Sequence, residues 1–197
     1  MTKEEFEVLW TNAYPLTPPI PHLFKHNYPE RWFRIHSLPN AKRFADTDQE
    51  WDTIIYRQNK IITDLIGNNS EVLLVMGQYN KSNGNGDFKS ESESFDIYKF
   101  SNLDAIDLNT VDYYQDYEDD MKYIPAFCKT TWTIDRHNKL LREIARDNVR
   151  AFFISPEQNI LIAPYDGGID IVLNDIETRD QFKTIYSDWL SSREDGY

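Results

Sequence analysis

Apolar side chains recur at helical spacing in several stretches of the chain, and these predict amphipathic helices. The stretches are residues 3–13, 48–66, 136–145 and 177–190. Thr2 with Glu5, and Thr47 with Glu50, match the capping-box pattern that starts a helix. Gly67 then supplies a stop for the second helix. The last helix is expected to bury its four apolar residues, Phe182, Ile185, Tyr186 and Trp189.

Other stretches alternate between apolar and polar residues or form short apolar runs, and these predict β-strands. They are residues 31–37, 72–79, 95–100, 122–134, 151–154, 160–163 and 169–173. The run from Val72 to Met76 predicts a strand buried on both faces. Turn residues separate the last three strands, and the Asp166-Gly167-Gly168 turn is expected to need positive φ. The pattern predicts a single α+β domain over residues 1–197, with a mainly antiparallel sheet flanked by about four helices.

Two segments interrupt this pattern and are expected to be exposed insertions. Residues 80–94 are rich in Gly, Ser and Asn, which is typical of an exposed loop. Residues 101–120 hold seven acidic residues and no basic residue. They lack the glycine and the regular oxygen-ligand spacing of a calcium loop. Between the first helix and the first strand, the prolines of residues 15–29 predict an irregular segment that wraps the core.

The overall charge excludes several classes of protein. The 197 residues include 21 Lys and Arg against 33 Asp and Glu, which gives a net charge of −12. This balance argues against a broad nucleic-acid interface and against docking on an anionic membrane. The single Cys128 excludes an internal disulfide framework, and no motif indicates a metal or another cofactor. The N-terminus lacks the apolar core of a secretory signal, so a cytoplasmic protein is expected.

The most informative feature is the uneven placement of this charge. Residues 22–43 contain five basic residues and only Glu30 as an acid, a local balance of +4. Guanidinium groups suit phosphate and carboxylate, so bases of this segment are candidates for binding a small anion together with two later aspartates. The candidates are Arg31, Arg34, His36, Lys42, Arg43, Asp166 and Asp170. The alternative is that the basic segment is an internal counterweight to the acidic remainder of the chain.

Asp170 allows two interpretations of its own. It begins an apolar strand segment, so it is expected either to face a polar pocket or to pair with Arg34. A carboxylate beside an arginine and a histidine can act as a general acid or base. The same three groups also describe a buried structural salt bridge. Whether the protein is an enzyme therefore stays open.

The acidic stretch suggests a different function, the binding of a basic protein. Tyrosine supplies interface area and carboxylates supply electrostatic steering. The candidate residues are Asp112, Tyr113, Tyr114, Asp116, Tyr117, Glu118, Asp119 and Asp120. The first hypothesis is thus a non-enzymatic binding protein, for example of the immunity type that neutralises a toxin. The second is an enzyme or a small-anion-binding protein that uses Arg34, His36 and Asp170.

Two segments carry a resemblance to known families. Residues 31–39 (RWFRIHSLP), followed by Lys42 and Arg43, and residues 164–170 (PYDGGID) resemble bacterial proteins of unknown function. The end of the chain is similar to another uncharacterised bacterial family with a Tyr-Asp-Asp-Arg-Gly-x-Asp motif and a Tyr-x-x-Trp helix. Here the first motif is one residue shorter and lacks the arginine, and the matching residues are Tyr165, Asp166, Gly168, Asp170, Tyr186 and Trp189. The resemblances imply a small bacterial cytosolic protein and bring no activity.

Overall fold

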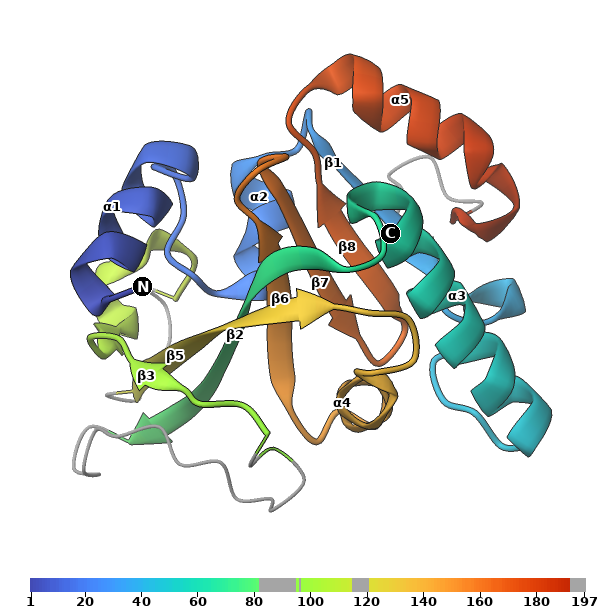
Figure 1. Ribbon diagram of the computed structural model, residues 1–197, viewed down its shortest axis with the longest axis horizontal. Helices are drawn as coiled ribbons and strands as arrows, with labels where there is room; N and C mark the ends of the chain where they lie inside the picture. Colours follow the sequence, from blue (N-terminus) through green and yellow to red (C-terminus); the bar gives the residue numbers. More distant parts are fainter. Residues whose placement is uncertain (82–94, 96, 115–120, 192–197) are drawn as a thin grey trace.

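A computed structural model describes residues 1–81, 95, 97–114 and 121–191. Within these residues one antiparallel sheet has the strand order β1-β8-β7-β6-β2-β5-β3, and β4 also pairs with β5 (Figure 1). The strands are β1 (Trp32–His36), β2 (Ser70–Lys81), β3 (Ser101–Asn102), β4 (Ile106–Asp107), β5 (Met121–Trp132), β6 (Arg150–Ser155), β7 (Ile160–Tyr165) and β8 (Gly168–Val172). The predicted meander of the last three strands is confirmed.

Helices cover both faces of this sheet. They are α1 (Lys3–Ala13), α2 (Phe24–Asn27), α3 (Asp48–Ile66), α4 (Asn138–Ala145) and α5 (Ile176–Ile185). The helices α3, α4 and α5 share one apolar core with the sheet, whereas α1 and α2 share a second core with its other face (Figure 1). The predicted α+β class is confirmed. Of the α-helices in the described residues, only the short α2 was not predicted, because it lies in the proline-rich segment.

The central strand β2 separates the two cores. Val72 and Leu74 pack with α3 and α4, while Leu73 and Val75 pack with α1 on the opposite face. All four side chains are buried. The apolar run therefore forms a strand buried on both faces, as its composition predicts.

Local signals set several helix ends as expected. The Thr2 side chain accepts from the Glu5 N–H and the Glu5 carboxylate accepts from the Thr2 N–H, so the capping box is complete. Gly67 takes φ 83° at the end of α3, a conformation that favours glycine. These contacts are formed between neighbours in the sequence, which is why the sequence predicts them.

One predicted strand was wrong, and one predicted helix is shorter than expected and does not bury all its apolar residues. The expected strand at 95–100 is instead a turn, in which the Tyr98 N–H donates to the Phe95 carbonyl at 2.8 Å. Both rings enter the α3 side of the core, which residues three apart cannot do from a strand. In the last helix, α5 ends at Ile185, whose side chain is 67% exposed and not buried.

The two expected insertions have different outcomes. Residues 82–94 lie outside the described residues. The described part of the acidic segment, residues 101–114, is mostly exposed, but it is joined to the sheet through β3 and β4. Its side chains Leu103, Leu108 and Tyr114 are buried. This part is therefore anchored to the sheet and is not a wholly exposed insertion.

The hairpin between β7 and β8 differs from the prediction in its backbone. Asp166 and Gly167 connect the paired residues Tyr165 and Gly168, and neither connecting residue has a φ in the left-handed region. The glycines instead provide space. A Cβ on Gly168 would lie 2.0 Å from the Ile35 carbonyl oxygen, so only glycine allows β1 this close.

Candidate functional site

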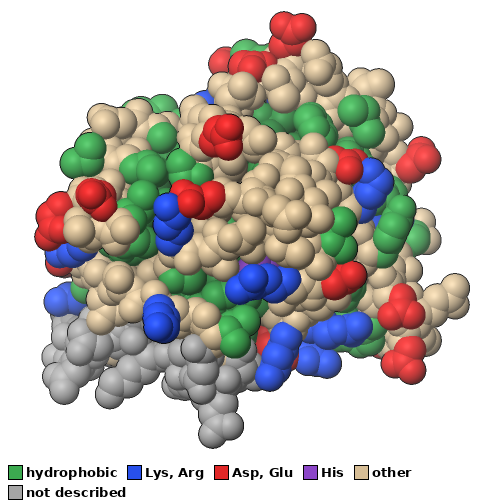
Figure 2. Space-filling model, in the orientation of Figure 1, with side chains coloured by type: hydrophobic (Ala, Val, Ile, Leu, Met, Phe, Trp, Pro, Cys, Tyr) green, Lys and Arg blue, Asp and Glu red, His purple; other side chains and the backbone are tan. Residues whose placement is uncertain are grey.

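A cavity of about 650 Å³ lies where β6 begins, β7 ends and β8 begins, beside α2. Four basic side chains from separate elements line it together with two of the predicted aspartates. They are Lys25 on α2, Arg34 on β1, Arg43 in the following loop and Arg150 on β6, with Asp166 and Asp170. On the face shown in Figure 2, Lys and Arg gather over α4, which leads into this region, while acidic side chains are spread over the rest.

Arg34 and Asp170 form a fixed ion pair on one side of the cavity. They face each other in the β1–β8 register, with Nε–Oδ1 and Nη2–Oδ2 distances of 2.7 and 2.9 Å. The Trp32 indole donates a further hydrogen bond to Oδ1 at 3.0 Å, and the guanidinium lies 4.7 Å from the centre of the Tyr165 ring. Both charged side chains are nearly inaccessible, at 12% and 8% exposed. The predicted pairing is confirmed.

Arg43 and Asp166 form a second pair with a different geometry. One guanidinium nitrogen of Arg43 contacts Asp166 Oδ2, and the arginine side chain is 64% exposed while the aspartate is buried. The arginine follows a turn in which Asn40 and Ala41 take φ 56° and 55°. Because a left-handed alanine costs roughly 1 kcal/mol, the turn directs Arg43 at some expense in backbone energy.

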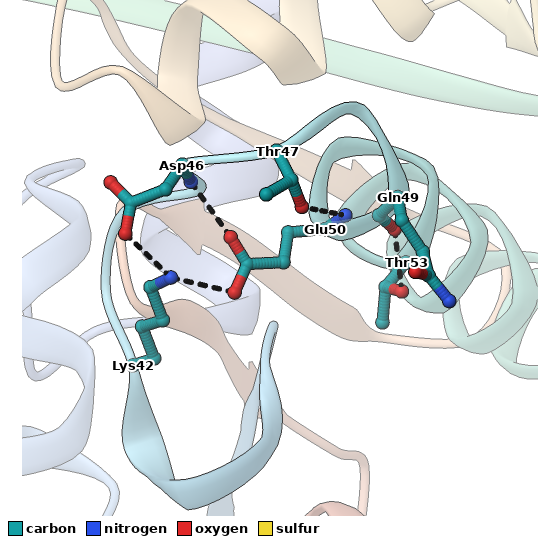
Figure 3. A network of polar contacts seen from close by, with 6 residues as sticks. All are labelled: Lys42, Asp46, Thr47, Gln49, Glu50 and Thr53. Carbon is teal, nitrogen blue, oxygen red and sulfur yellow. Dashed lines mark hydrogen bonds and ion pairs between the residues drawn. The ribbon is translucent and has the colours of Figure 1, made fainter.

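The remaining predicted anion ligands do not line the cavity. Lys42 forms ion pairs with Asp46 and Glu50 at 2.8 and 2.6 Å, at the start of α3 (Figure 3). Hydrogen bonds to these two carboxylates raise the pKa of Lys42. Arg31 lies over the Tyr28 ring at 4.7 Å and donates to the Asn174 carbonyl at 3.3 Å. Both residues therefore stabilise local structure, which is the counterweight role.

His36 also lies outside the cavity lining. It shares the sheet face of Arg34, and burial followed by the nearby guanidinium lowers its pKa. Its Nε2 atom is buried without a hydrogen-bond partner among the described residues. The expected convergence of Arg34, His36 and Asp170 around one pocket is thus only partial.

The opposite end of the cavity is aromatic, and the sequence analysis missed it. His22 Nδ1 lies 3.4 Å from the Tyr79 hydroxyl, its Nε2 contacts the Tyr114 hydroxyl, and the two hydroxyls are 3.0 Å apart. Burial, followed by the charge of Arg150, lowers the pKa of His22 to about 4. Burial also raises the pKa of Tyr114. His22 and Tyr114 are therefore neutral near pH 7, and the three groups form a polar cluster.

The sequence also did not indicate Arg150 as a residue of the cavity. Its guanidinium lies 5.0 Å from the centre of the Tyr79 ring, and no described carboxylate forms an ion pair with it. Asp147 lines the same cavity without such a pair. A single arginine at the start of a strand carries no motif, and it reaches Tyr79 only through the pairing of β6 with β2.

The predicted partner-binding residues also divide. Asp112 is exposed and Tyr113 is 51% exposed, but Tyr114 is buried within the cluster just described and cannot belong to an external face. Tyr113 and Tyr114 both line the cavity. The remaining candidates, Asp116, Tyr117, Glu118, Asp119 and Asp120, lie outside the described residues.

Other chemistry receives little support. Cys128 is buried, and burial raises the pKa of its thiol to about 12, so it is not a thiolate near pH 7. In the described ranges, His, Cys, Asp and Glu do not gather into a group of three or more that suits a metal ion. No helix in the same ranges is both long and apolar enough to cross a membrane.

A family model described as a domain of unknown function (DUF3885) matches residues 20–194. The chain belongs to this family. The match contains both segments that resemble uncharacterised proteins, and it begins after α1. No curated protein and no solved structure matches the chain. Membership of DUF3885 therefore brings no activity, and the cavity must be interpreted from its own chemistry.

Proposed function

We propose that this protein binds a small anionic molecule in the cavity between α2, β6, β7 and β8. The observation that supports it most strongly is the position of Lys25, Arg34, Arg43 and Arg150, which come from separate elements and line one cavity. Binding of a small anion was the alternative hypothesis from the sequence. The proposal also keeps the expected cytoplasmic location in a bacterial cell.

The four basic residues do not have equal roles. Arg34 is held by Asp170 and Trp32, so it stabilises the wall of the cavity and contributes no uncompensated charge. Arg43 is exposed and has one contact to a carboxylate, so its other guanidinium nitrogens can bind a ligand while that contact stays in place. Arg150 lies on a tyrosine ring and forms no ion pair with a described carboxylate. Arg43 and Arg150 are therefore the proposed ligands of the anion.

Lys25 adds to the positive potential. Burial, followed by repulsion from Arg34, lowers the pKa of Lys25, whereas Asp170 opposes this change. The charge of Asp170 thus acts on both Lys25 and Arg34. An anion bound nearby would relieve the repulsion between the cations, and it would raise the pKa of Lys25 again.

Calorimetric titration with phenyl phosphate and with phenol tests the proposal, because the two compounds share a ring and differ in charge. We expect phenyl phosphate to bind and phenol to bind at least about tenfold more weakly, since charge-assisted hydrogen bonds contribute about 1.5–3 kcal/mol each. Arg43→Gln and Arg150→Gln should each weaken phenyl phosphate about tenfold. Arg146→Gln is the matched control, because Arg146 pairs with Glu143 on α4 and does not line the cavity. Equal binding of both compounds, or no effect of either cavity variant, would refute the proposal.

Recognition of a basic protein partner, the first hypothesis from the sequence, stays a prediction. Its only described candidates with exposed side chains are Asp112 and Tyr113. Affinity purification from the native host at low and high salt tests it. A co-purifying basic protein that is lost in an Asp112→Asn and Tyr113→Ala double variant would favour this function over the cavity.

A further inference from the structure

Resting on the proposed anion site, we propose that its ligand carries a flat aromatic ring beside the anionic group, as an aryl phosphate does. The ring would lie at the end formed by His22, Tyr79 and Tyr113, and Tyr113 would determine the selectivity for it. The anion would lie between the two arginines Arg43 and Arg150. The inference thus names a ligand class and a specificity-determining residue.

The size of the cavity is the first argument. Pockets of about 300–1,000 Å³ hold drug-sized molecules, and this cavity of about 650 Å³ falls within that range. Inorganic phosphate or sulfate would leave most of it unfilled. The ligand therefore needs a body as well as a charge.

The side chains at the aromatic end of the cavity indicate the chemical nature of the uncharged part of the ligand. Tyr113 packs its ring 5.6 Å from His22 and 5.1 Å from His26, with ring planes inclined by 60° and 33°. Its side chain is nevertheless 51% exposed, so part of an anchored aromatic ring remains accessible at the cavity. Leu108 and Met121 line the same end. An anchored ring among apolar side chains favours stacking with another ring.

Arg150 connects the two ends. Its guanidinium lies over the Tyr79 ring at 5.0 Å, and both groups line the cavity. A guanidinium held against a ring can bind an anion through its N–H edge while its plane stays available for stacking. A ligand that joins a ring directly to an anion fits this arrangement, because its two parts would meet at Arg150.

Comparison of phenyl phosphate with glycerol 1-phosphate tests the inference, since the two share the phosphate and differ in the ring. Calorimetry should give at least about tenfold tighter binding of phenyl phosphate, the range found for aromatic stacking. Tyr113→Leu keeps the apolar contact to the histidines and should reduce this ratio below about threefold, with glycerol 1-phosphate affinity unchanged. Tyr56→Leu is the matched control, because Tyr56 is 60% exposed on α3 and packs against Trp189. Intermolecular NOEs from the phenyl ring to the Tyr113 ring provide a readout that needs no variant.

The outcomes separate the two proposals. Equal affinities of the two phosphates, a ratio unchanged in Tyr113→Leu, or no NOE to Tyr113 would overturn the aromatic inference and leave the anion site intact. Failure of both phosphates to bind at about 10 mM would overturn the anion site itself.

Discussion

The Arg34–Asp170 and Arg43–Asp166 pairs join the same residue types beside the same cavity, yet their surroundings differ. The first pair is bidentate, receives a third hydrogen bond from Trp32 and is almost inaccessible. The second has one nitrogen–oxygen contact and an arginine that is 64% exposed. From the sequence alone, all four residues are candidates for the same anion site, and nothing distinguishes one pair from the other.

This difference shows that exposure and coordination determine which pair stabilises the fold and which can serve a ligand. If one member of a buried ion pair is removed or moves away, the charge of the other member stays buried without a partner, which is unfavourable. The exposed Arg43 can instead bind a ligand through its remaining guanidinium nitrogens while it keeps its contact to the buried Asp166. We therefore assign Arg34 to the fold and Arg43 to the ligand.

Loss of one carboxylate tests this assignment with the largest expected effect. Asp170→Asn keeps the shape of the side chain but leaves the Arg34 charge buried, and we expect the free energy of unfolding to fall by about 3–5 kcal/mol. Asp166→Asn should lower it by only about 1 kcal/mol, since Arg43 remains hydrated. Urea unfolding followed by tryptophan fluorescence measures both. Equal losses in the two variants would show that the pairs do not differ.

Lowering the pH tests whether the stability of the aromatic end of the cavity depends on an uncharged His22. The pKa of His22 is about 4 in the folded protein against 6.5 ordinarily, so the unfolded chain binds a proton first as the pH falls. Stability should be complete above about pH 6.5 and fall toward pH 4, by up to about 3 kcal/mol. Urea unfolding at pH 7 and 4.5 measures the loss. The difference should shrink in His22→Gln, and an undiminished pH dependence there would assign the effect to other groups.

Removal of the exposed arginine separates its effect on binding from its effect on stability. Arg43→Gln should lower the free energy of unfolding by about 1–2 kcal/mol, less than Asp170→Asn, because the glutamine amide can still donate to the buried Asp166 carboxylate. Phenyl phosphate affinity should nevertheless fall about tenfold. A thermal melt and a titration on the same preparation measure the two effects. A large loss of stability with unchanged affinity would reverse the roles of the two arginines.

The smallest effect is expected at Lys42, which lies next to Arg43 in the sequence but outside the cavity. Its ion pair with Asp46 is exposed and the one with Glu50 is partly exposed, so Lys42→Gln should leave the thermal midpoint nearly unchanged. Phenyl phosphate affinity should also be unchanged, as measured by calorimetry. Weaker binding of phenyl phosphate to this variant would mean that positive charge near the cavity affects the affinity more than direct contact with the ligand does.

The sequence predicted those parts of the fold that depend on neighbouring residues. The capping box of Thr2 and Glu5, the stop at Gly67 and the doubly buried strand at 72–76 depend on short-range pattern and burial. The turn at Phe95 was misread because Phe95 and Ile97, and likewise Tyr98 and Phe100, are two residues apart, which resembles the alternation of a strand. Gly168 was misread because the close approach of β1 requires it, and not a local turn type.

The candidate site was predictable only in part. Arg34 and Asp170 lie on predicted strands, and their pairing was one of two stated alternatives. Lys42 was wrongly included among the candidates that line the cavity, because its pairing with Asp46, four residues away, was not considered. Arg150 and Tyr79 had no signal, since only the pairing of β6 with β2 brings them together. Long-range register therefore limits what this sequence reveals about its cavity.

The pairing of β1 with β8 also determines at which stage of protein synthesis the cavity can form. Arg34 and Asp170 are 136 positions apart, whereas β6, β7 and β8 follow one another directly. Contacts between distant segments require the closure of long loops, which slows folding. A ribosome must release every residue from β1 to β8 before the two strands can pair. Any ligand of this cavity can therefore bind only after β8 has emerged, and it cannot guide the earlier steps of synthesis.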